Sequence, residues 1–302
     1  MQYPLLQKLI TESKSQLPLG VVYPLSLPAL ETVFELIKKE ICKPILIGPQ
    51  KLITELAKGE NFSLDGIEII DTPDDPITAT KTAVAMVKLG KLAALMKGSL
   101  HTEDLMGPIV SRDGLRTDRR TSHLFLFELD RYPKLLGISD CVVNISPNAS
   151  QKVQILKSSL EALNQLGIEN TKVAIIAATE VINPSMQATM DAKEIVDIHK
   201  SNPIYPHTTI EGPFGFDNAI SAQSAQTKGI KSAVAGTPDL LLVPDLQVGN
   251  ILYKSLVYMA GAECAGVILG AQVPVILTSR SDSVFSRIAS TAMAIRLAKT
   301  SL

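Results

Sequence analysis

Short apolar runs alternate with segments of helical spacing along most of this 302-residue chain. Apolar residues that recur every three or four positions predict a helix at 28–41, and the apolar run after it predicts a buried strand at 44–48. Further runs predict strands at 67–70, 92–96, 124–127, 141–145, 173–177, 240–243, 266–269 and 275–277. Strands that alternate with helices indicate an α/β protein with mostly parallel sheets.

Two polar junctions each join a predicted strand to a predicted helix. One lies between the strand at 240–243 and a helix predicted at 251–260 and runs from Pro244 to Asn250. The other follows the strand at 275–277 and reads Thr278-Ser279-Arg280-Ser281-Asp282-Ser283. Such junctions direct side chains and free helix N–H groups into the crevice where ligands bind, and they suit an anion. Taken alone, the second junction favours a simple helix cap at Asp282 or Ser283, because every helix needs a cap.

Composition narrows the range of functions. The formal net charge is −1 and the isoelectric point is about 6.4, so no positive field predicts a nucleic-acid or membrane partner. The longest apolar run is too short to span a bilayer and the N-terminus lacks a signal-peptide layout, so we expect a cytoplasmic protein. Three widely spaced cysteines and four histidines without ligand spacing predict neither a disulfide framework nor a metal site.

Several longer phrases are specific enough to suggest a family. They lie at 212–219 (Gly-Pro-Phe-Gly-Phe-Asp-Asn-Ala), 234–236, 243–255, 266–270 and 278–283. An earlier group contains Leu95-Met96-Lys97-Gly98, His101-Thr102, Gly114-Leu115-Arg116-Thr117, Arg119-Arg120 and Ser122-His123. From about residue 80 to its end, the chain resembles the phosphate acetyltransferase and phosphate butyryltransferase family. The earlier group is similar to the butyryltransferase-like branch.

The resemblance implies a two-domain, three-layer α/β/α architecture of the isocitrate/isopropylmalate-dehydrogenase type. A length of 302 residues agrees with two domains. We expect residues 1–132 with 268–302 to form a discontinuous first α/β domain and 133–267 to form the second. The chain would first cross between them at 130–133, and the active site would lie in the cleft between the domains.

The implied reaction converts acyl-CoA and inorganic phosphate into acyl phosphate and CoA, with a short acyl group such as acetyl, propionyl or butyryl. Both the thioester and the acyl phosphate are activated, so we expect no metal or redox cofactor, and CoA and phosphate are substrates. The site must hold phosphate, stabilise an oxyanion and manage the proton of the CoA thiol. The family also implies a homodimer.

On this resemblance, the candidate catalytic residues are Ser279, Arg280 and Asp282. Arg280 would bind phosphate through its guanidinium fork, and Ser279 would donate a hydrogen bond to the oxyanion or the sulfur. The acetyltransferase branch has an aspartate seven residues after the motif serine, where this chain has Ser286, so Asp282 is the nearest candidate base. The candidate phosphate and CoA ligands are Lys97, Arg116, Asp217, Asn218, Asp245, Asn250, Thr278 and Ser283.

Two other functions stay open at this point. One is an NAD(P)-dependent dehydrogenase of the same architecture, since a fold does not determine a function. The chain contains no Gly-x-Gly-x-x-Gly after a strand and no phosphate-loop Gly-Lys-Ser/Thr, although dehydrogenases of this architecture need not use the former. The other is a non-catalytic protein that binds CoA or acyl phosphate.

Overall fold

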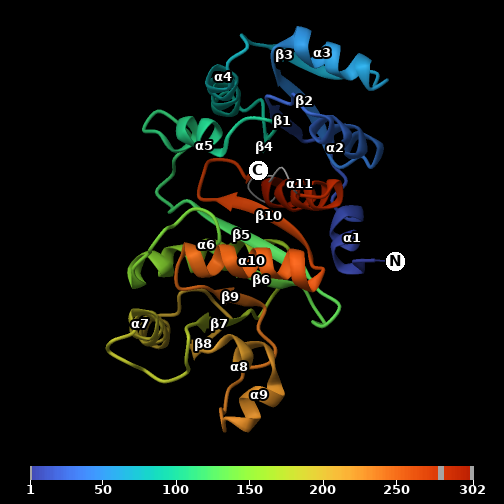
Figure 1. Cartoon of the computed structure of the whole chain (residues 1–302). Coiled ribbons are helices and arrows are strands. Elements are labelled where there is room, and N and C mark those ends of the chain that lie inside the picture. Colours follow the sequence, from blue (N-terminus) through green and yellow to red (C-terminus); the bar gives the residue numbers. More distant parts are fainter. Residues whose placement is uncertain (1, 278–281, 300–302) are drawn as a thin grey trace. The chain divides into compact units, whose positions relative to one another are not determined.

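The chain divides into two compact units (Figure 1). The computed structural model describes residues 2–277 and 282–299. Unit 1 comprises Met1–Thr121 and Cys264–Leu302, and unit 2 comprises Ser122–Glu263. Each unit contains both helices and strands. Unit 1 is discontinuous in sequence.

The boundaries between the units differ from the expected ones. Segment 130–133 forms the turn between the antiparallel strands β5 (Ser122–Glu128) and β6 (Leu136–Ser139), so the chain does not cross between units there. Because β5 pairs with β6, it belongs to unit 2, and the first boundary falls before it. The return to unit 1 comes at Cys264, near the start of strand β10 (Glu263–Leu269).

Unit 1 contains strands in the order β3-β2-β1-β4-β11-β10. All are parallel except β10, which runs antiparallel to β11. The other strands are β1 (Pro18–Val22), β2 (Lys43–Gly48), β3 (Glu68–Asp71), β4 (Ala94–Lys97) and β11 (Val275–Ile276). The helices are α1 (Pro4–Thr11), α2 (Leu27–Lys38), α3 (Gln50–Gly59), α4 (Pro76–Lys88), α5 (Thr102–Val110) and α11 (Val284–Lys299).

Unit 2 contains strands in the order β5-β6-β9-β7-β8. Strands β6 to β8 run parallel in this order and β5 runs antiparallel to β6. The other strands are β7 (Lys172–Ile176), β8 (Thr209–Phe214) and β9 (Leu240–Leu242). The helices are α6 (Ala149–Gln165), α7 (Gln187–Ser201), α8 (Phe216–Ile220), α9 (Ala222–Thr227) and α10 (Leu246–Ala260).

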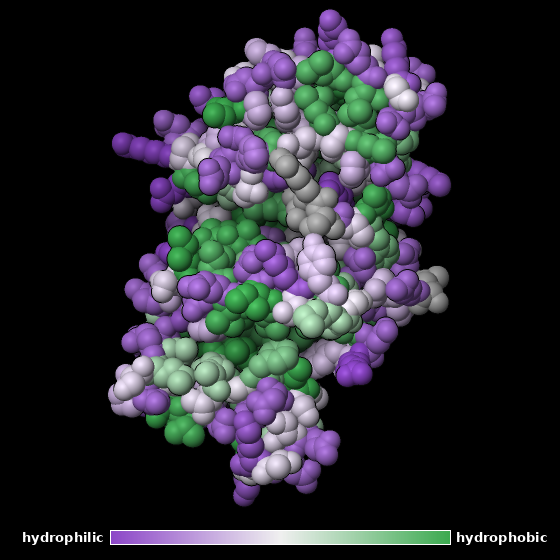
Figure 2. All heavy atoms as spheres, viewed as in Figure 1, coloured by the Kyte–Doolittle hydropathy of each residue, from purple (hydrophilic) through white to green (hydrophobic). Residues whose placement is uncertain are grey.

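The hydrophobic cores explain why the central strands are almost entirely apolar. Every residue of β4, β6 and β9 is buried, as expected for strands that are covered on both faces. Helix α11 is buried along nearly its whole length and packs on β4 and β11. Figure 2 shows hydrophilic side chains over much of one face of the molecule, with hydrophobic side chains gathered near α10.

The α/β class with mostly parallel strands is confirmed, but one predicted strand is wrong. Residues 141–145 form turns and bends instead of a strand. The Asp140 carboxylate accepts hydrogen bonds from the backbone N–H groups of Val142, Val143 and Asn144, at 2.9, 3.1 and 3.2 Å. These N–H groups are satisfied locally, which removes them from any strand ladder.

Cys42, Cys141 and Cys264 are all buried free thiols. Over the ranges that the structure describes, we find no helix with the length and apolar character needed to cross a membrane.

Candidate functional site

The carboxyl ends of β4 and β11 bring Lys97 to the start of the second polar junction. The two strands are parallel neighbours, so their carboxyl ends lie at the same edge of the sheet. The register pairs Ile276 with Met96, which places Lys97 one step further along β4. The matching position on β11 is Leu277, directly before Thr278. We call the carboxyl ends of β1, β4 and β11, with the first turn of α11, the unit 1 edge.

Lys97 is buried and its position is set by close backbone packing. The next residue, Gly98, donates its N–H to Val22 O at 2.9 Å. A Cβ at Gly98 would lie 2.4 Å from Val22 O and 2.5 Å from Tyr23 O, so only glycine permits this approach. The ammonium group is therefore presented from a rigid strand end.

The predicted residues Thr278, Ser279 and Arg280 lie outside the described residues, whereas Asp282 and Ser283 can be placed. Ser283 Oγ accepts a hydrogen bond from Ser286 N at 2.9 Å, and Ser283 O accepts one from Arg287 N at 3.1 Å. Ser283 is thus the N-cap of α11. The cap does not use the carboxylate of Asp282, which is half-buried beside it.

Arg287 is a buried cation at the unit 1 edge that the sequence analysis missed. Its Nε donates to the backbone oxygen of Asp282 at 3.4 Å. Burial lowers the pKa of Arg287, while the carboxylates of Asp282 and Glu31 act to raise it. A cation in the first turn of a helix opposes the helix dipole, so an anion bound there would be favoured. In the sequence, Arg287 could have been recognised as an arginine in the first turn of the helix that follows the second polar junction.

Arg116 lies at the other end of β11. It forms an isolated antiparallel bridge with Ala271, which is in the hairpin between β10 and β11. Thr117 Oγ1 donates to Gly270 O at 2.8 Å in the same hairpin. The hairpin lies where β11 begins, whereas Lys97 lies level with the end of β11. Unit 1 therefore does not bring Arg116 and Lys97 together.

The carboxyl ends of β6, β7, β8 and β9 form a second edge, the unit 2 edge, which is rich in carboxylates. Asp140 follows β6 and is buried, and in addition to its backbone donors it accepts a hydrogen bond from Asn144 Nδ2 at 2.5 Å. Burial raises the pKa of Asp140, whereas these hydrogen bonds act to lower it. Its oxygens are therefore occupied by the loop that it organises.

Asp245 and Asn250 lie in the first turns of α10 at the unit 2 edge. Asp245 Oδ1 accepts from Val248 N at 2.9 Å and caps the helix. Asn250 Nδ2 lies 3.5 Å from Cys141 O. A Cβ at Gly249 would lie 2.7 Å from Asp140 O, so the helix packs closely on the loop after β6. Asp245 therefore caps α10, and Asn250 connects the helix to the loop after β6.

Asp217 and Asn218 follow β8 and belong to a local polar network. Asp217 accepts from Ser224 Oγ at 2.7 Å and forms an ion pair with Lys228 at 3.1 Å. The hydrogen bond from Ser224, followed by that from Lys228, lowers the pKa of Asp217. Asn218 is fully buried and donates to Glu180 Oε2 at 2.9 Å. Its Oδ1 has no hydrogen-bond partner in the described part of the chain.

His123 lies at the unit 2 edge because β5 begins where β6 ends. Ser139 Oγ donates to His123 O at 2.8 Å, and the His123 ring centroid lies 4.1 Å from that of Phe125. Neither ring nitrogen has a partner among the residues that the structure places. Burial lowers the pKa of His123 to about 3, so the imidazole is neutral.

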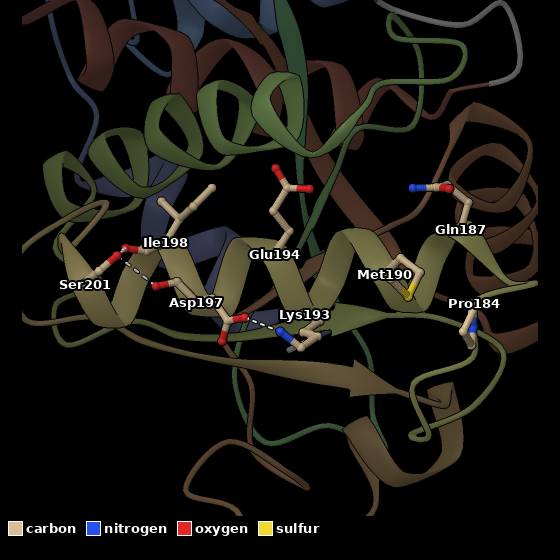
Figure 3. Close-up of a pocket in the computed structure, with 8 residues that line it drawn as sticks. All are labelled: Pro184, Gln187, Met190, Lys193, Glu194, Asp197, Ile198 and Ser201. Carbon is tan, nitrogen blue, oxygen red and sulfur yellow. Dashed lines mark hydrogen bonds and ion pairs between the residues drawn. The ribbon is translucent and has the colours of Figure 1, made fainter.

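Three cavities lie away from the candidate site residues. A groove of about 540 Å³ follows α7, where Lys193 and Asp197 form an ion pair at 2.5 Å and Glu194 points away from them (Figure 3). A cavity of about 230 Å³ lies near the amino ends of β1 and β4. Another, of about 360 Å³, lies near the amino ends of β7 and β8. None of the candidate site residues lines these three cavities. Within the described ranges, no group of three His, Cys, Asp or Glu residues is arranged to hold a metal ion.

Comparison with known proteins gives consistent matches over most of the chain. A family model described as phosphate acetyl/butaryl transferase matches residues 77–295, which include every candidate site residue. The phosphate acetyltransferase of Rickettsia felis is 38% identical over 277 residues, or 91% of this chain and 79% of that relative. The phosphate butyryltransferase of Clostridium beijerinckii is 36% identical over 268 residues, or 88% of each. The crystal structure of a branched-chain phosphotransacylase from Enterococcus faecalis has a TM-score of 0.81 and 28% identity, covering 94% of this chain and 99% of that one.

Proposed function

The chain belongs to the phosphate acetyltransferase and phosphate butyryltransferase family, and we propose that it transfers a short acyl group between CoA and inorganic phosphate. Acyl-CoA and phosphate give acyl phosphate and CoA, and the reverse reaction uses the same groups. The match of the family model to 77–295 is the observation that carries this proposal. This match favours an acyltransferase function over the two alternatives, an NAD(P)-dependent dehydrogenase and a non-catalytic CoA-binding protein.

The unit 1 edge is the proposed phosphate site. Lys97 supplies a buried positive charge at the end of β4, and Arg287 supplies another in the first turn of α11. Arg280 is proposed to add a guanidinium fork that binds two phosphate oxygens. A phosphate anion here would offset the burial of two cations and the unfavourable position of Arg287 at a helix N-terminus.

The chemical step requires an oxygen of the bound phosphate to attack the thioester carbonyl carbon. A tetrahedral oxyanion forms, the carbon–sulfur bond breaks, and CoA leaves as a thiolate that takes up a proton. Ser279 and Thr278 are proposed to donate hydrogen bonds to the oxyanion or the sulfur. In the reverse direction Asp282 is proposed to take the thiol proton, and Arg287 holds its backbone through the bond to Asp282 O.

For the unit 2 edge we propose a supporting role around acyl-CoA. The caps and ion pairs of Asp245, Asn250 and Asp217 fix the loops after β6, β8 and β9. Asn218 holds Glu180 in the same network. These residues would determine the shape of the loops that receive CoA, and Arg116 would meet a phosphate group of CoA at the other end of β11.

We also propose that the enzyme needs no metal or redox cofactor and works as a cytoplasmic homodimer. Both acyl donors are already activated, so positioning and charge are sufficient for the reaction. Three buried free thiols are typical of a protein that stays in a reducing compartment.

The test is release of free CoA thiol from acetyl-CoA, propionyl-CoA and butyryl-CoA, with and without inorganic phosphate and after dialysis against a chelator. We expect release that depends on phosphate, survives the chelator and differs among the acyl-CoAs, because each methylene changes selectivity by about 1–3 kcal/mol. Release without phosphate, or reduction of NAD(P) by hydroxy acids in place of thiol release, would overturn the proposal.

A further inference from the structure

Tyr23 joins the ends of three neighbouring strands at the unit 1 edge. It directly follows β1, and its backbone N–H donates to Ile47 O of β2 at 2.7 Å. Its carbonyl oxygen accepts from Ser99 N, just after β4, at 2.8 Å and from Leu25 N at 2.9 Å. One residue therefore ties β1 to the strands on both of its sides.

The side chain of Tyr23 extends this tie to a fourth strand. Its hydroxyl donates to Asp74 Oδ1, which lies in the loop after β3. Since β2 lies between β1 and β3 in the sheet, this hydrogen bond crosses the end of β2. The next residue, Asp75, accepts from Thr78 N at 2.8 Å and caps α4, so the loop that carries Asp74 is itself anchored. We call the Tyr23–Asp74 pair the tyrosine brace.

The backbone of Tyr23 has a conformation that few bulky residues adopt. Its φ is 55°, in the left-handed region that favours glycine. Such conformations persist only where the surrounding contacts fix them, and they are common at functional sites. The hydrogen bonds of the Tyr23 backbone and hydroxyl provide these contacts. Tyr23 is therefore held in place at a cost in backbone strain, next to the proposed phosphate site.

The element that these contacts hold is the end of β4, which carries Lys97. The strand register pairs Lys97 with Val22, the residue before Tyr23. Gly98 N donates to Val22 O at 2.9 Å. The bond from Ser99 N to Tyr23 O comes next along the same two strands. The β1–β4 pairing thus continues past Lys97 as far as Tyr23.

We propose that Tyr23 is a positioning residue for phosphate binding and acts by holding Lys97 at the unit 1 edge. Strand β11 fixes β4 from one side, and β1 with the tyrosine brace fixes it from the other. Without the brace, the ammonium group of Lys97 would meet phosphate in a less favourable position. The inference rests on the proposed phosphate site and adds to it a residue outside 77–295, the range that the family model matches.

The hydroxyl of Tyr23 remains a donor over the working pH range. Partial burial, followed by the hydrogen bond to Asp74, raises the pKa of Tyr23 to about 12. The contribution of the brace should therefore be the same at pH 6 and pH 8. A residue that exchanged a proton with the substrate would instead change the shape of the pH profile.

The test combines Tyr23→Phe, which removes only the hydroxyl, with Lys97→Met. We expect Tyr23→Phe to raise the KM for phosphate about three- to ten-fold, the equivalent of one hydrogen bond, with the KM for acyl-CoA nearly constant. In the Lys97→Met background, the same substitution should change kcat/KM for phosphate less than about two-fold, because the brace acts through Lys97. Tyr258→Phe, which alters an exposed tyrosine of unit 2, is the matched control and should behave as the wild type.

Two substitutions of Asp74 test the other half of the brace. Asp74→Ala removes the acceptor and should match Tyr23→Phe, whereas Asp74→Asn keeps an oxygen that accepts from the hydroxyl and should stay close to the wild type. Asp74 is exposed, so both variants should fold. An unchanged KM for phosphate in Tyr23→Phe and Asp74→Ala would overturn the proposal. So would an effect of Tyr23→Phe that is equally large in the Lys97→Met background.

Calorimetric titration with inorganic phosphate separates this inference from the proposed function. We expect the wild type to bind phosphate more tightly than Tyr23→Phe and Asp74→Ala, whether or not thiol release is found. Phosphate binding without thiol release would overturn acyl transfer alone. Equal phosphate binding by the wild type and both variants would overturn the brace alone. A wild type that binds no phosphate would overturn the phosphate site and this inference with it.

Discussion

The carboxyl edges of the two units differ in their buried charged groups, which are cations in unit 1 and a carboxylate in unit 2. At the unit 1 edge, the buried Lys97 ends β4 and the buried Arg287 lies in the first turn of α11. At the unit 2 edge, the carboxylates of Asp140 and Asp245 accept backbone N–H groups from their own loops. The unit 2 charges organise local structure, whereas the unit 1 charges are the ones that we propose to bind an anionic substrate.

Replacing a unit 1 cation should have the largest effect on catalysis. Lys97→Met keeps the length and apolar stem of the side chain but removes the charge. We expect a fall in kcat/KM for phosphate of about 10²–10³-fold, the usual effect of removing one electrostatic contact to a transition state. The melting temperature should stay near that of the wild type. Steady-state kinetics measure kcat/KM, and a thermal melt measures the melting temperature. A wild-type rate in Lys97→Met would show that Lys97 is not part of the phosphate site.

Replacing the buried carboxylate at the unit 2 edge should instead affect folding. Asp140→Ala leaves three backbone N–H groups and the Asn144 amide without their acceptor. We expect a loss of about 3 kcal/mol in the free energy of unfolding. Denaturant titration measures this loss. The rate per folded molecule should change only a few-fold. A large loss of rate in a fully stable variant would show that Asp140 acts in catalysis and would contradict its assignment as a structural residue.

His123 should make the stability of the protein depend on pH. Its pKa is about 3 in the folded protein, below the ordinary value of 6.5, so the unfolded chain binds the proton first. Its contribution is complete above pH 6.5 and is lost as the pH falls toward 3. At pH 4.5 the loss should be about 3 kcal/mol.

The matched variant is His123→Phe, which keeps a ring against Phe125 but cannot be protonated. Unfolding free energies at pH 7 and pH 4.5 should differ less in this variant than in the wild type. The same difference in both proteins would show that His123 does not set the pH dependence.

Asp217→Asn should have the smallest effect. The Asp217 side chain is more than half exposed, and its ion pair with Lys228 is open to solvent. Solvent screens such pairs, so we expect no measurable change in melting temperature and a change in rate below about three-fold. A rate loss comparable to that of Lys97→Met would instead place Asp217 in direct contact with substrate.

Much of the fold follows from apolar spacing. The helical pattern at 28–41 corresponds to α2, and the apolar runs at 44–48 and 240–243 correspond to β2 and β9. Strands β1 and β8 escaped prediction because Pro18, Gly20 and the Gly212-Pro213 pair interrupt their apolar pattern. The strand predicted at 141–145 is wrong because a short apolar run can also form a buried loop. Asp140 organises this loop.

The candidate site was predictable only as a set of junctions. Apolar spacing identified the segment before α11, and the strand register places Lys97 level with Leu277, where that segment begins. Sequence could not show that Arg116 pairs with Ala271 of the β10–β11 hairpin, because that pairing joins distant segments of the chain. Arg287 was missed for a similar reason, because its burial depends on how α11 packs on the sheet.

The central claim is that the cations of the unit 1 edge bind phosphate, and a phosphate titration of Arg287→Met and Arg287→Lys beside the wild type tests it most directly. At saturating acyl-CoA, we expect the KM for phosphate to rise about ten-fold or more in Arg287→Met and less in Arg287→Lys, which keeps the charge but loses the fork. The KM for acyl-CoA should stay nearly constant. An unchanged KM for phosphate in both variants, or a rise confined to the KM for acyl-CoA, would contradict the account.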